Sequence, residues 1–167
     1  MKSIDLIRSK IVQRKELARF LEQKRALGQK IIFTNGCFDI LHRGHIEYLS
    51  QASDLGDCFV IGLNNDDSVR HLKGESRPAI DEESRALTIA SFEFVDYVVL
   101  FGEDTPSDLI RVIRPDYWVK GGDYQNYKEL PEYKALMETG GKVKLISFVE
   151  GYSTTDIYKK IQGQAEN

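Results

Sequence analysis

Short apolar runs alternate along the chain with segments in which apolar residues recur every three or four positions. The runs are rich in β-branched and aromatic residues, and each ends at or near a glycine or an asparagine, which is typical of strands. They occupy 31–33, 58–63, 95–101, 117–119 and 143–149. The pattern therefore predicts five strands, each followed by a turn.

The segments between the runs have helical periodicity. Pro106 suits the first turn of a helix over 107–113, and Pro115 stops that helix. Gly140 and Gly141 give the C-terminal signal of another helix. The predicted helices cover much of 4–28, then 45–54, 85–92, 107–113, 130–139 and a last segment after Gly151.

This alternation predicts the fold class. Strands alternating with helices indicate an α/β fold, a Rossmann-like five-stranded parallel sheet with helices on both faces. We divide the chain into an N-terminal helical arm at 1–28, a main domain at 29–162 and a frayed tail at 163–167. The apolar residues of the arm suit either the chain's own sheet or a second subunit, so a homo-oligomer is left open.

Composition and charge exclude several classes of protein. The chain has 167 residues with a net charge of −3, 41% hydrophobic and 29% charged residues, which are ordinary globular values. It lacks the basic excess of a nucleic-acid binder, a signal peptide and an apolar run long enough to span a membrane. Cys37 and Cys58 are expected to be free thiols, which favours the cytoplasm. We expect neither nucleic acid nor membrane as a partner.

Ligands of such sheets bind beyond the carboxyl ends of the strands, so the residues that follow each strand are informative. After the first strand, His42 and His45 flank Gly44 at the expected start of a helix. A helix N-terminus, two imidazoles and a glycine that admits close approach suit a polyphosphate. Surface histidines, packing histidines and a zinc site completed by Cys37 are the alternatives.

Two other strand ends carry cations and glycines. Lys73 and Arg77 lie in a Gly/Pro-containing loop after the second strand, which is either a solvated loop or part of a phosphate site. Lys120 and Gly121 lie after the fourth strand with Asp123 two residues on. They form either a plain turn or room for a base or ribose.

Three hydroxyl residues, Ser153, Thr154 and Thr155, open the last helix. One hydroxyl is explained by helix capping, and three in a row also suit phosphate binding at a helix N-terminus. Candidate ligand-binding residues therefore follow four of the five strands, which predicts one binding site at the carboxyl edge of the sheet.

The stretch Cys-Phe-Asp-Ile-Leu-His-Arg-Gly-His at 37–45 resembles the His-x-Gly-His signature of the cytidylyltransferase-like nucleotidyltransferases. The resemblance runs from about residue 30 to residue 161 through Leu-Lys-Gly, Arg-Pro, Asp-Thr-Pro, Val-Lys-Gly-Gly-Asp-Tyr and Glu-Gly-x-Ser-Thr-Thr. This series is similar to the heptose 1-phosphate adenylyltransferase branch. Glycerol-3-phosphate cytidylyltransferases carry an arginine where this chain has Phe148.

The resemblance implies a nucleotidyltransferase fold and an activity. The expected reaction is adenylyl transfer from ATP to D-glycero-D-manno-heptose 1-phosphate, which gives ADP-heptose and pyrophosphate for the lipopolysaccharide inner core. Mg²⁺ would arrive with the ATP phosphates, with no metal site of the protein's own. We expect a stand-alone form, because 167 residues leave no room for the kinase half found in some relatives. A separate sugar kinase and a phosphatase would then act upstream.

The resemblance also suggests roles for the candidate residues, with Asp39 fixing the histidine loop rather than moving a proton. His42 and His45 would contact the triphosphate, and Lys73 would bridge the sugar phosphate and the α-phosphate, with Arg77 as a second substrate-binding candidate. The expected nucleotide-binding residues are Cys37, Phe38, Gly44, Lys120, Gly121, Asp123, Ser153, Thr154 and Thr155.

Three other functions stay open at this point. One is a cytidylyltransferase acting on a polyol phosphate such as glycerol 3-phosphate. A second is a non-catalytic nucleotide-binding protein on the same scaffold. A third, of a different class, is a zinc or redox module built on Cys37, Cys58 and His71.

Overall fold

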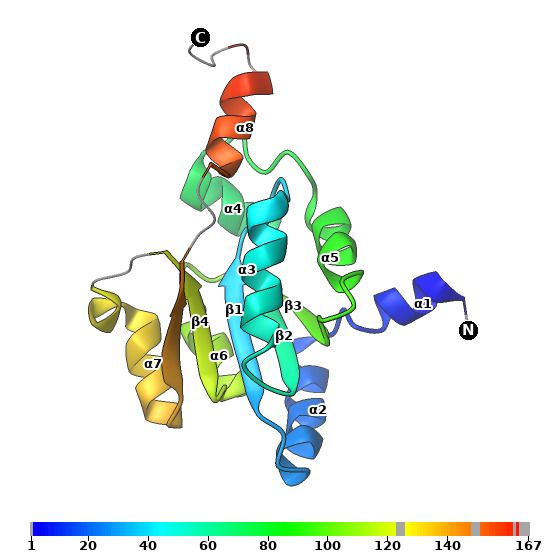
Figure 1. The fold of residues 1–167 in the computed structure, drawn as a ribbon, viewed down its shortest axis with the longest axis vertical. Helices are drawn as coiled ribbons and strands as arrows, with labels where there is room; N and C mark the ends of the chain where they lie inside the picture. Colours follow the sequence, from blue (N-terminus) through cyan, green and yellow to red (C-terminus); the bar gives the residue numbers. More distant parts are fainter. Residues whose placement is uncertain (1, 123–125, 148–150, 162, 164–167) are drawn as a thin grey trace.

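A computed structural model describes residues 2–122, 126–147, 151–161 and 163 of the chain. Its centre is a sheet of five parallel strands in the order β3-β2-β1-β4-β5 (Figure 1). The strands are β1 (Ile31–Gly36), β2 (Cys58–Asn64), β3 (Tyr97–Phe101), β4 (Tyr117–Gly121) and β5 (Lys142–Ile146). The predicted five-stranded parallel sheet is confirmed.

Helices cover both faces of this sheet, which confirms the predicted layers (Figure 1). One face packs against α2 (Arg14–Ala26), α6 (Ser107–Ile113) and α7 (Pro131–Thr139). The other packs against α3 (Arg43–Ser53) and α5 (Glu82–Ala90). This layering leaves the carboxyl edge of the strands as the place where loops and helix starts gather.

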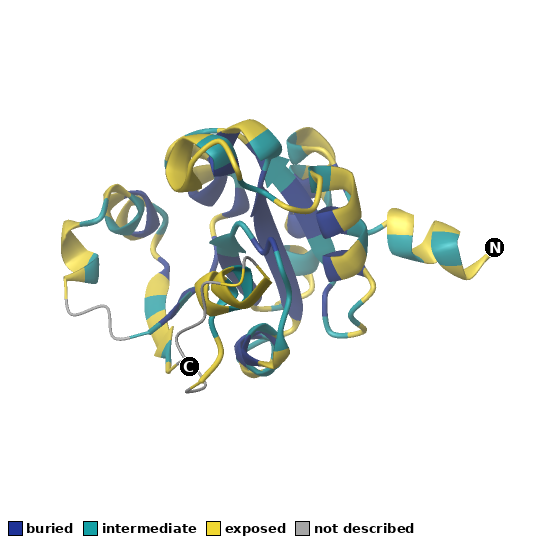
Figure 2. Ribbon diagram, turned by 90° about the horizontal axis from the view of Figure 1, so that it is seen from above, coloured by how far each residue is buried: buried dark blue, intermediate teal, exposed yellow. Residues whose placement is uncertain are grey.

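The strands are buried on both faces, and that explains their continuous apolar runs. Successive residues of β1 enter opposite cores, with Ile31 and Phe33 on the α2–α6–α7 side and Ile32 on the α3–α5 side. Viewed from above, the buried residues concentrate in the strands and in the inner sides of the helices (Figure 2). Successive side chains therefore alternate between two cores, although all of them are buried and the run looks uniformly apolar in sequence.

The N-terminal arm is two helices rather than one continuous segment. Between α1 (Ser3–Arg8) and α2 the chain is extended, and Val12 N donates to Val98 O of β3 at 2.9 Å. The β-branched pair Ile11-Val12 favours this extended pairing over helix. Leu17 and Leu21 of α2 are fully buried against the chain's own sheet, which is one of the two placements left open by the sequence.

The segment after β2 corrects the sequence interpretation, which took it as a Gly/Pro loop. It contains α4 (Asp66–Lys73), so Lys73 is the last residue of a helix. Asn65 caps α4 through its side chain, which accepts from Ser68 N at 2.9 Å. The helix has only eight residues, and Gly74 and Pro78, which follow it, are typical of a loop and determined the sequence interpretation. The capping asparagine was the available clue.

The C-terminal part of the chain ends in a short 3-10 turn, a strand and a helix. The turn is η1 (Tyr127–Glu129), and the last helix is α8 (Thr154–Ile161). The strand predicted at 143–149 is observed as β5, which ends at Ile146, and 148–150 lie outside the described residues. Within the described part of the chain, every helix is too short or too polar to cross a lipid bilayer.

Candidate active site

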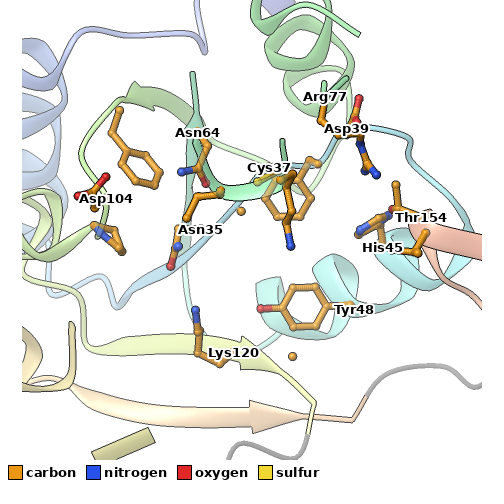
Figure 3. A pocket seen from close by; sticks show the side chains of 18 of the residues that line it. Asn35, Cys37, Asp39, His45, Tyr48, Asn64, Arg77, Asp104, Lys120 and Thr154 are labelled. Carbon is orange, nitrogen blue, oxygen red and sulfur yellow. Dashed lines mark hydrogen bonds and ion pairs between the residues drawn. The ribbon is translucent and has the colours of Figure 1, made fainter. Parts of the chain in front are cut away.

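A cavity of about 540 Å³ opens at the carboxyl edge of the sheet. Strand ends form its floor, with Gly36 of β1, Asn64 of β2 and Gly121 of β4 among the lining residues (Figure 3). The strand order reverses between β1 and β4, and α/β sheets bind ligands at this kind of switch point. The predicted location of the site is where the structure has its cavity.

His45 is held on the cavity wall between two rings. Its imidazole stacks on that of His42, with ring centroids 3.9 Å apart, and Phe38 approaches edge-on with centroids 5.7 Å apart. The Nδ1 atoms of both histidines are buried and lack a hydrogen-bond partner among the described residues. Buried polar atoms are normally paired, so these two atoms are unusual. Of the two residues, His45 lines the cavity and is the one that a ligand there can contact.

Burial controls the protonation of this pair. Desolvation, with a smaller contribution from the neighbouring His42, lowers the pKa of His45 to about 4. Desolvation also lowers the pKa of His42. Both rings are therefore neutral at pH 7, and each neutral imidazole still offers one N–H donor to a phosphate oxygen.

Helix α3 begins beside the histidines and presents its positive end to the cavity. His42 is the N-cap residue with extended backbone, and the first turn carries no acidic side chain that would neutralise the helix dipole. Gly44 lets His42 and Tyr152 pack closely on this turn, because a Cβ atom there would lie 3.1 Å from His42 Nδ1 and 3.1 Å from Tyr152 Cβ. The histidine signature thus combines a helix start, two imidazoles and the small residue that lets them pack.

Asp39 organises the loop that leads into α3. Its side chain is 2% exposed and accepts from four donors: Arg77 Nε at 2.8 Å, Tyr158 OH at 2.7 Å, Ala79 N at 2.8 Å and Ile80 N at 3.2 Å. Burial alone would raise the pKa of this carboxyl, but these hydrogen bonds lower it overall. Four donors occupy the lone pairs of the carboxylate, which leaves Asp39 a structural task.

Two lysines bring positive charge to the cavity. Lys73 lies at the C-terminal end of α4, and its charge lowers the pKa of the Cys37 thiol against the larger, raising effect of burial. Lys120 of β4 has its ammonium 5.0 Å from the centre of the Trp118 ring, and burial lowers its pKa while Glu132 opposes that shift. The negative charge of a bound polyphosphate would balance the positive charges of both lysines.

The start of α8 closes the cavity on the side of His45 (Figure 3). Ser153 caps the helix, since its Oγ accepts from Asp156 N at 3.4 Å. Thr154 and Thr155 line the cavity, and Thr154 Oγ1 donates to Ile40 O at 3.3 Å. Hydroxyls at a helix N-terminus are a suitable environment for phosphate.

The structure brings most of the candidate residues into one cavity. Three of them, His42, Gly44 and Ser153, are not among its lining residues, and they support His45 or begin α8 instead. Asp123 lies outside the described residues. The candidates that line the cavity are Cys37, Phe38, His45, Lys73, Arg77, Lys120, Gly121, Thr154 and Thr155.

Other lining residues went unnoticed in the sequence. Asn35 and Asn64 stand at the ends of β1 and β2, where they were interpreted only as strand terminators. Tyr48 lies one helical turn after His45 on α3, and this spacing of three was the available signal. Asp104, on the opposite side of the cavity from Thr154, belongs to the Asp-Thr-Pro motif of the resemblance, but no role was assigned to it (Figure 3).

Arg85 supports the cavity from behind. It is 1% exposed, and its guanidinium donates to Cys37 O at 2.6 Å, Asn64 O at 2.9 Å, Ile80 O at 2.9 Å and Asp66 Oδ1 at 2.7 Å. A buried cation needs such full pairing. Arg85 thereby joins the ends of β1 and β2 to the segments that carry Lys73 and Arg77.

The zinc or redox module built on Cys37, Cys58 and His71 is ruled out by the strand register. Ile31 pairs with Cys58 at the start of the strands, whereas Cys37 follows Gly36 at their other end. Six residues of strand separate the two levels, which is roughly 20 Å. Both cysteines are free thiols.

The fold and cavity define a class: α/β proteins with a ligand cavity at the carboxyl edge of a parallel sheet and paired histidines at a helix start. The family model described as cytidylyltransferase-like matches residues 33–162. The chain belongs to the cytidylyltransferase-like family.

Relatives of known name match nearly the whole chain. It is 53% identical over 154 residues to the bifunctional protein HldE of Wolinella succinogenes, which covers 92% of this chain and 31% of that protein. Identity to the HldE of Helicobacter pylori strain J99 is 52%, covering 87% of this chain and 30% of that protein. The chain spans about a third of the length of these relatives.

Solved structures agree on the fold. A lipopolysaccharide core biosynthesis protein from Thermoplasma volcanium has a TM-score of 0.60 and 31% identity, covering 75% of this chain and all of that chain. A pantoate-beta-alanine ligase from Francisella tularensis has a TM-score of 0.57 at 13% identity, covering 91% of this chain and 76% of that one. The second likeness concerns the fold alone.

Proposed function

We propose that the protein transfers the adenylyl group of ATP to D-glycero-D-manno-heptose 1-phosphate, giving ADP-heptose and pyrophosphate. The observation that carries the proposal is the 53% identity to HldE across 92% of the chain, since the chain resembles the adenylyltransferase branch of that family. The likeness to a lipopolysaccharide core biosynthesis protein supports a role in that pathway.

The proposed chemistry needs no covalent intermediate with the protein. An oxygen of the sugar 1-phosphate attacks the α-phosphorus of ATP, the bond from the α-phosphorus to its bridging oxygen breaks, and pyrophosphate leaves with both electrons of that bond. Catalysis of such a transfer rests on positioning and on stabilising charge in the transition state.

The cavity residues suit distinct parts of the substrates. His45, supported by His42, is proposed to donate to the triphosphate, and Thr154 and Thr155 with the start of α8 to hold the β- and γ-phosphates. Lys73 is proposed to bridge the sugar phosphate and the α-phosphate. Each assignment rests on a residue that lines the same cavity. Because the Thr154 hydroxyl already donates to Ile40 O, Thr154 is proposed to contribute the backbone N–H at the start of the helix.

The remaining candidates fit the nucleoside part and the loop. Cys37 and Phe38 at the end of β1 and Gly121 at the end of β4 flank the switch point, where the base and ribose are proposed to lie. Asp123 stays a nucleotide-binding proposal from the family resemblance. Arg77 lines the cavity while its Nε is engaged by Asp39, so it is proposed to act on the substrate only through its remaining N–H groups.

Magnesium is proposed to enter as part of the substrate MgATP. No group of three His, Cys, Asp or Glu side chains within the described residues is arranged to hold a metal, and the carboxylate of Asp39 is fully engaged. Mg²⁺ commonly keeps several waters and binds through substrate phosphates, which suits a cavity of this kind. The ion would neutralise charge on the departing pyrophosphate.

The proposed function also suggests which reactions come before this enzyme and in which compartment it works. The proposed acceptor is a sugar 1-phosphate, and the family resemblance implies a separate sugar kinase and a phosphatase upstream. The two free thiols favour a reducing compartment, and we propose the cytoplasm. A homo-oligomer remains a proposal from the apolar residues of the arm.

A panel of nucleotides and acceptors tests the function. The protein is incubated with Mg²⁺, each of ATP, CTP, GTP and UTP, and either heptose 1-phosphate or glycerol 3-phosphate, while pyrophosphate is followed. We expect release with ATP and heptose 1-phosphate. Release with CTP and glycerol 3-phosphate alone would establish the polyol phosphate alternative, and nucleotide binding without release would establish a non-catalytic binder.

A further inference from the structure

Helix α8 is anchored differently from the other helices that reach the cavity. None of its residues, Thr154–Ile161, is buried, whereas α3 buries four. An isolated helix of this length is marginal in water, and helices in proteins gain most of their stability from packing an apolar face. The position of α8 must therefore depend on a few specific contacts.

One such contact joins α8 to the histidine loop. Tyr158 OH donates to Asp39 Oδ2 at 2.7 Å, and the Arg77 guanidinium carbon lies 3.6 Å from the centre of the Tyr158 ring. Arg77 Nε donates to the same Oδ2 at 2.8 Å. Three segments far apart in sequence, the loop before α3, the segment before α5 and α8, thus meet at one buried carboxylate.

These contacts are strong ones for their type. Hydrogen bonds to an ionised carboxylate are roughly twice as strong as neutral ones, and a guanidinium stacked on an aromatic face adds a cation–π attraction. The exposed fraction of the Asp39 side chain is 2% and that of Arg77 is 16%, so water competes little. We call this group of Asp39, Arg77 and Tyr158 the α8 latch.

The latch acts on the residues that the proposed function assigns to phosphate. Tyr158 lies one helical turn after Thr154, which lines the cavity and donates to Ile40 O at 3.3 Å, next to Asp39. Tyr152 packs beside His42, with ring centroids 6.1 Å apart. The start of α8 is thereby fixed against the same loop that presents His45.

We propose that Tyr158 and Asp39 are positioning residues, which dock α8 so that its N-terminus faces the phosphates of the bound nucleotide. The inference rests on the proposed nucleotide site, and it adds a residue that touches no substrate. Asp39 acts through Tyr158 and Arg77 and not as a base, because four donors occupy its carboxylate.

The test uses Tyr158→Phe, which removes one hydroxyl and keeps the ring under Arg77. Tyr97→Phe is the matched control: Tyr97 stands at the start of β3, at the opposite end of the sheet from the cavity, and its hydroxyl has no hydrogen bond within the described residues. Asp39→Asn and the double variant complete a cycle that measures the coupling between the two positions.

Amide hydrogen exchange of the full chain without nucleotide is the first readout. In Tyr158→Phe we expect exchange at residues 154–161 to rise at least about tenfold, since a hydrogen bond to a buried charge is lost, with the midpoint of thermal unfolding close to wild type. Tyr97→Phe should leave exchange in α8 unchanged. Unchanged exchange in Tyr158→Phe would overturn the latch, whatever the enzyme's substrate is.

Affinity for MgATP, measured by calorimetry, is the second readout. We expect Tyr158→Phe to weaken binding about tenfold, and to have almost no further effect in the Asp39→Asn background. Faster exchange of α8 with unchanged affinity, or additive effects of the two substitutions, would overturn the positioning role. Absence of MgATP binding by the wild-type chain would instead contradict the proposed function. The hydrogen-exchange experiment, which uses no nucleotide, would then still test the latch.

Discussion

Two helices, α3 and α8, bring their N-termini to the same cavity, but they are fixed there by different forces. Helix α3 buries Tyr48, Leu49 and Ala52 against the sheet, so the position of His45 is fixed by the hydrophobic core. Helix α8 buries no residue and is tied by the latch and by Thr154. We infer that changes near α3 disturb chemistry within an intact fold, whereas changes near α8 alter substrate binding.

The largest effect is expected from His45→Ala. His45 lies on the cavity wall, where a neutral imidazole can donate one N–H to the triphosphate. Loss of one preorganised donor should lower kcat by about 100-fold or more, with little change in the circular dichroism of the folded chain. Steady-state assays of pyrophosphate release measure this, and turnover near the wild-type rate would remove His45 from the mechanism.

A smaller effect is expected from Gly44→Ala, which tests whether the packing of α3 positions the histidines. The added Cβ would lie 3.1 Å from His42 Nδ1, so the His42 ring must shift and carry His45 with it. We expect kcat/KM to fall about tenfold, because small misplacements of reacting groups are costly. The free energy of unfolding, measured with urea, should change by less than about 1 kcal/mol, since alanine suits a helix better than glycine. Unchanged kcat/KM would show that the added methyl group is accommodated without moving His45, and that this packing does not position the histidines.

Thr154→Val tests the role of α8 in substrate binding, because valine has nearly the same shape as threonine but lacks the hydroxyl. It removes the hydroxyl that donates to Ile40 O at 3.3 Å and that lines the cavity. One lost hydrogen bond should raise KM for MgATP about fivefold and leave kcat within about twofold. If kcat fell and KM stayed constant, α8 would belong to the chemistry and the proposed division between the helices would be wrong.

The last prediction concerns the pH dependence of stability rather than activity, so it stands outside this order of catalytic effects. The pKa of His45 is lowered to about 4 in the folded protein, so between that value and the ordinary pKa near 6.5 the unfolded chain binds the extra proton. Keeping His45 neutral in the folded protein therefore costs nothing at pH 7. As pH falls from 6.5 towards 4, protonation of His45 in the unfolded chain lowers the free energy of unfolding. Urea unfolding of His45→Gln against wild type from pH 7 to pH 4 should show a shallower decline in the variant. If the free energies of unfolding of the variant and the wild type declined in parallel with pH, the buried, neutral state of His45 would be contradicted.

The sheet and the location of the site could be predicted from the sequence because both depend on local, repeated signals. Runs such as Cys58–Asn64 are continuous because both faces of the strand are buried, and parallel strands place their carboxyl ends at one edge. The candidate residues were all found by looking at that edge. Helix α4 was not predicted because it spans only eight residues and is followed by Gly74 and Pro78, which favour a loop interpretation.

The contacts that organise the site could not be predicted in the same way. Asp39, Arg77 and Tyr158 are up to 119 positions apart, and nothing in their local sequence says that they meet. Arg85 looked like an ordinary helical residue, although it is 1% exposed and joins two strand ends. Such pairings depend on the tertiary arrangement, which hydrophobic periodicity does not encode.

Adenylyl transfer can be tested most directly by following which phosphorus of ATP reaches the sugar. The protein is incubated with heptose 1-phosphate and ATP that carries a radioactive label at either the α- or the γ-phosphorus, and the products are separated. The account predicts that the α-label appears in ADP-heptose and the γ-label in pyrophosphate. Transfer of the γ-label to the sugar, or no transfer of the α-label to heptose 1-phosphate, would contradict it.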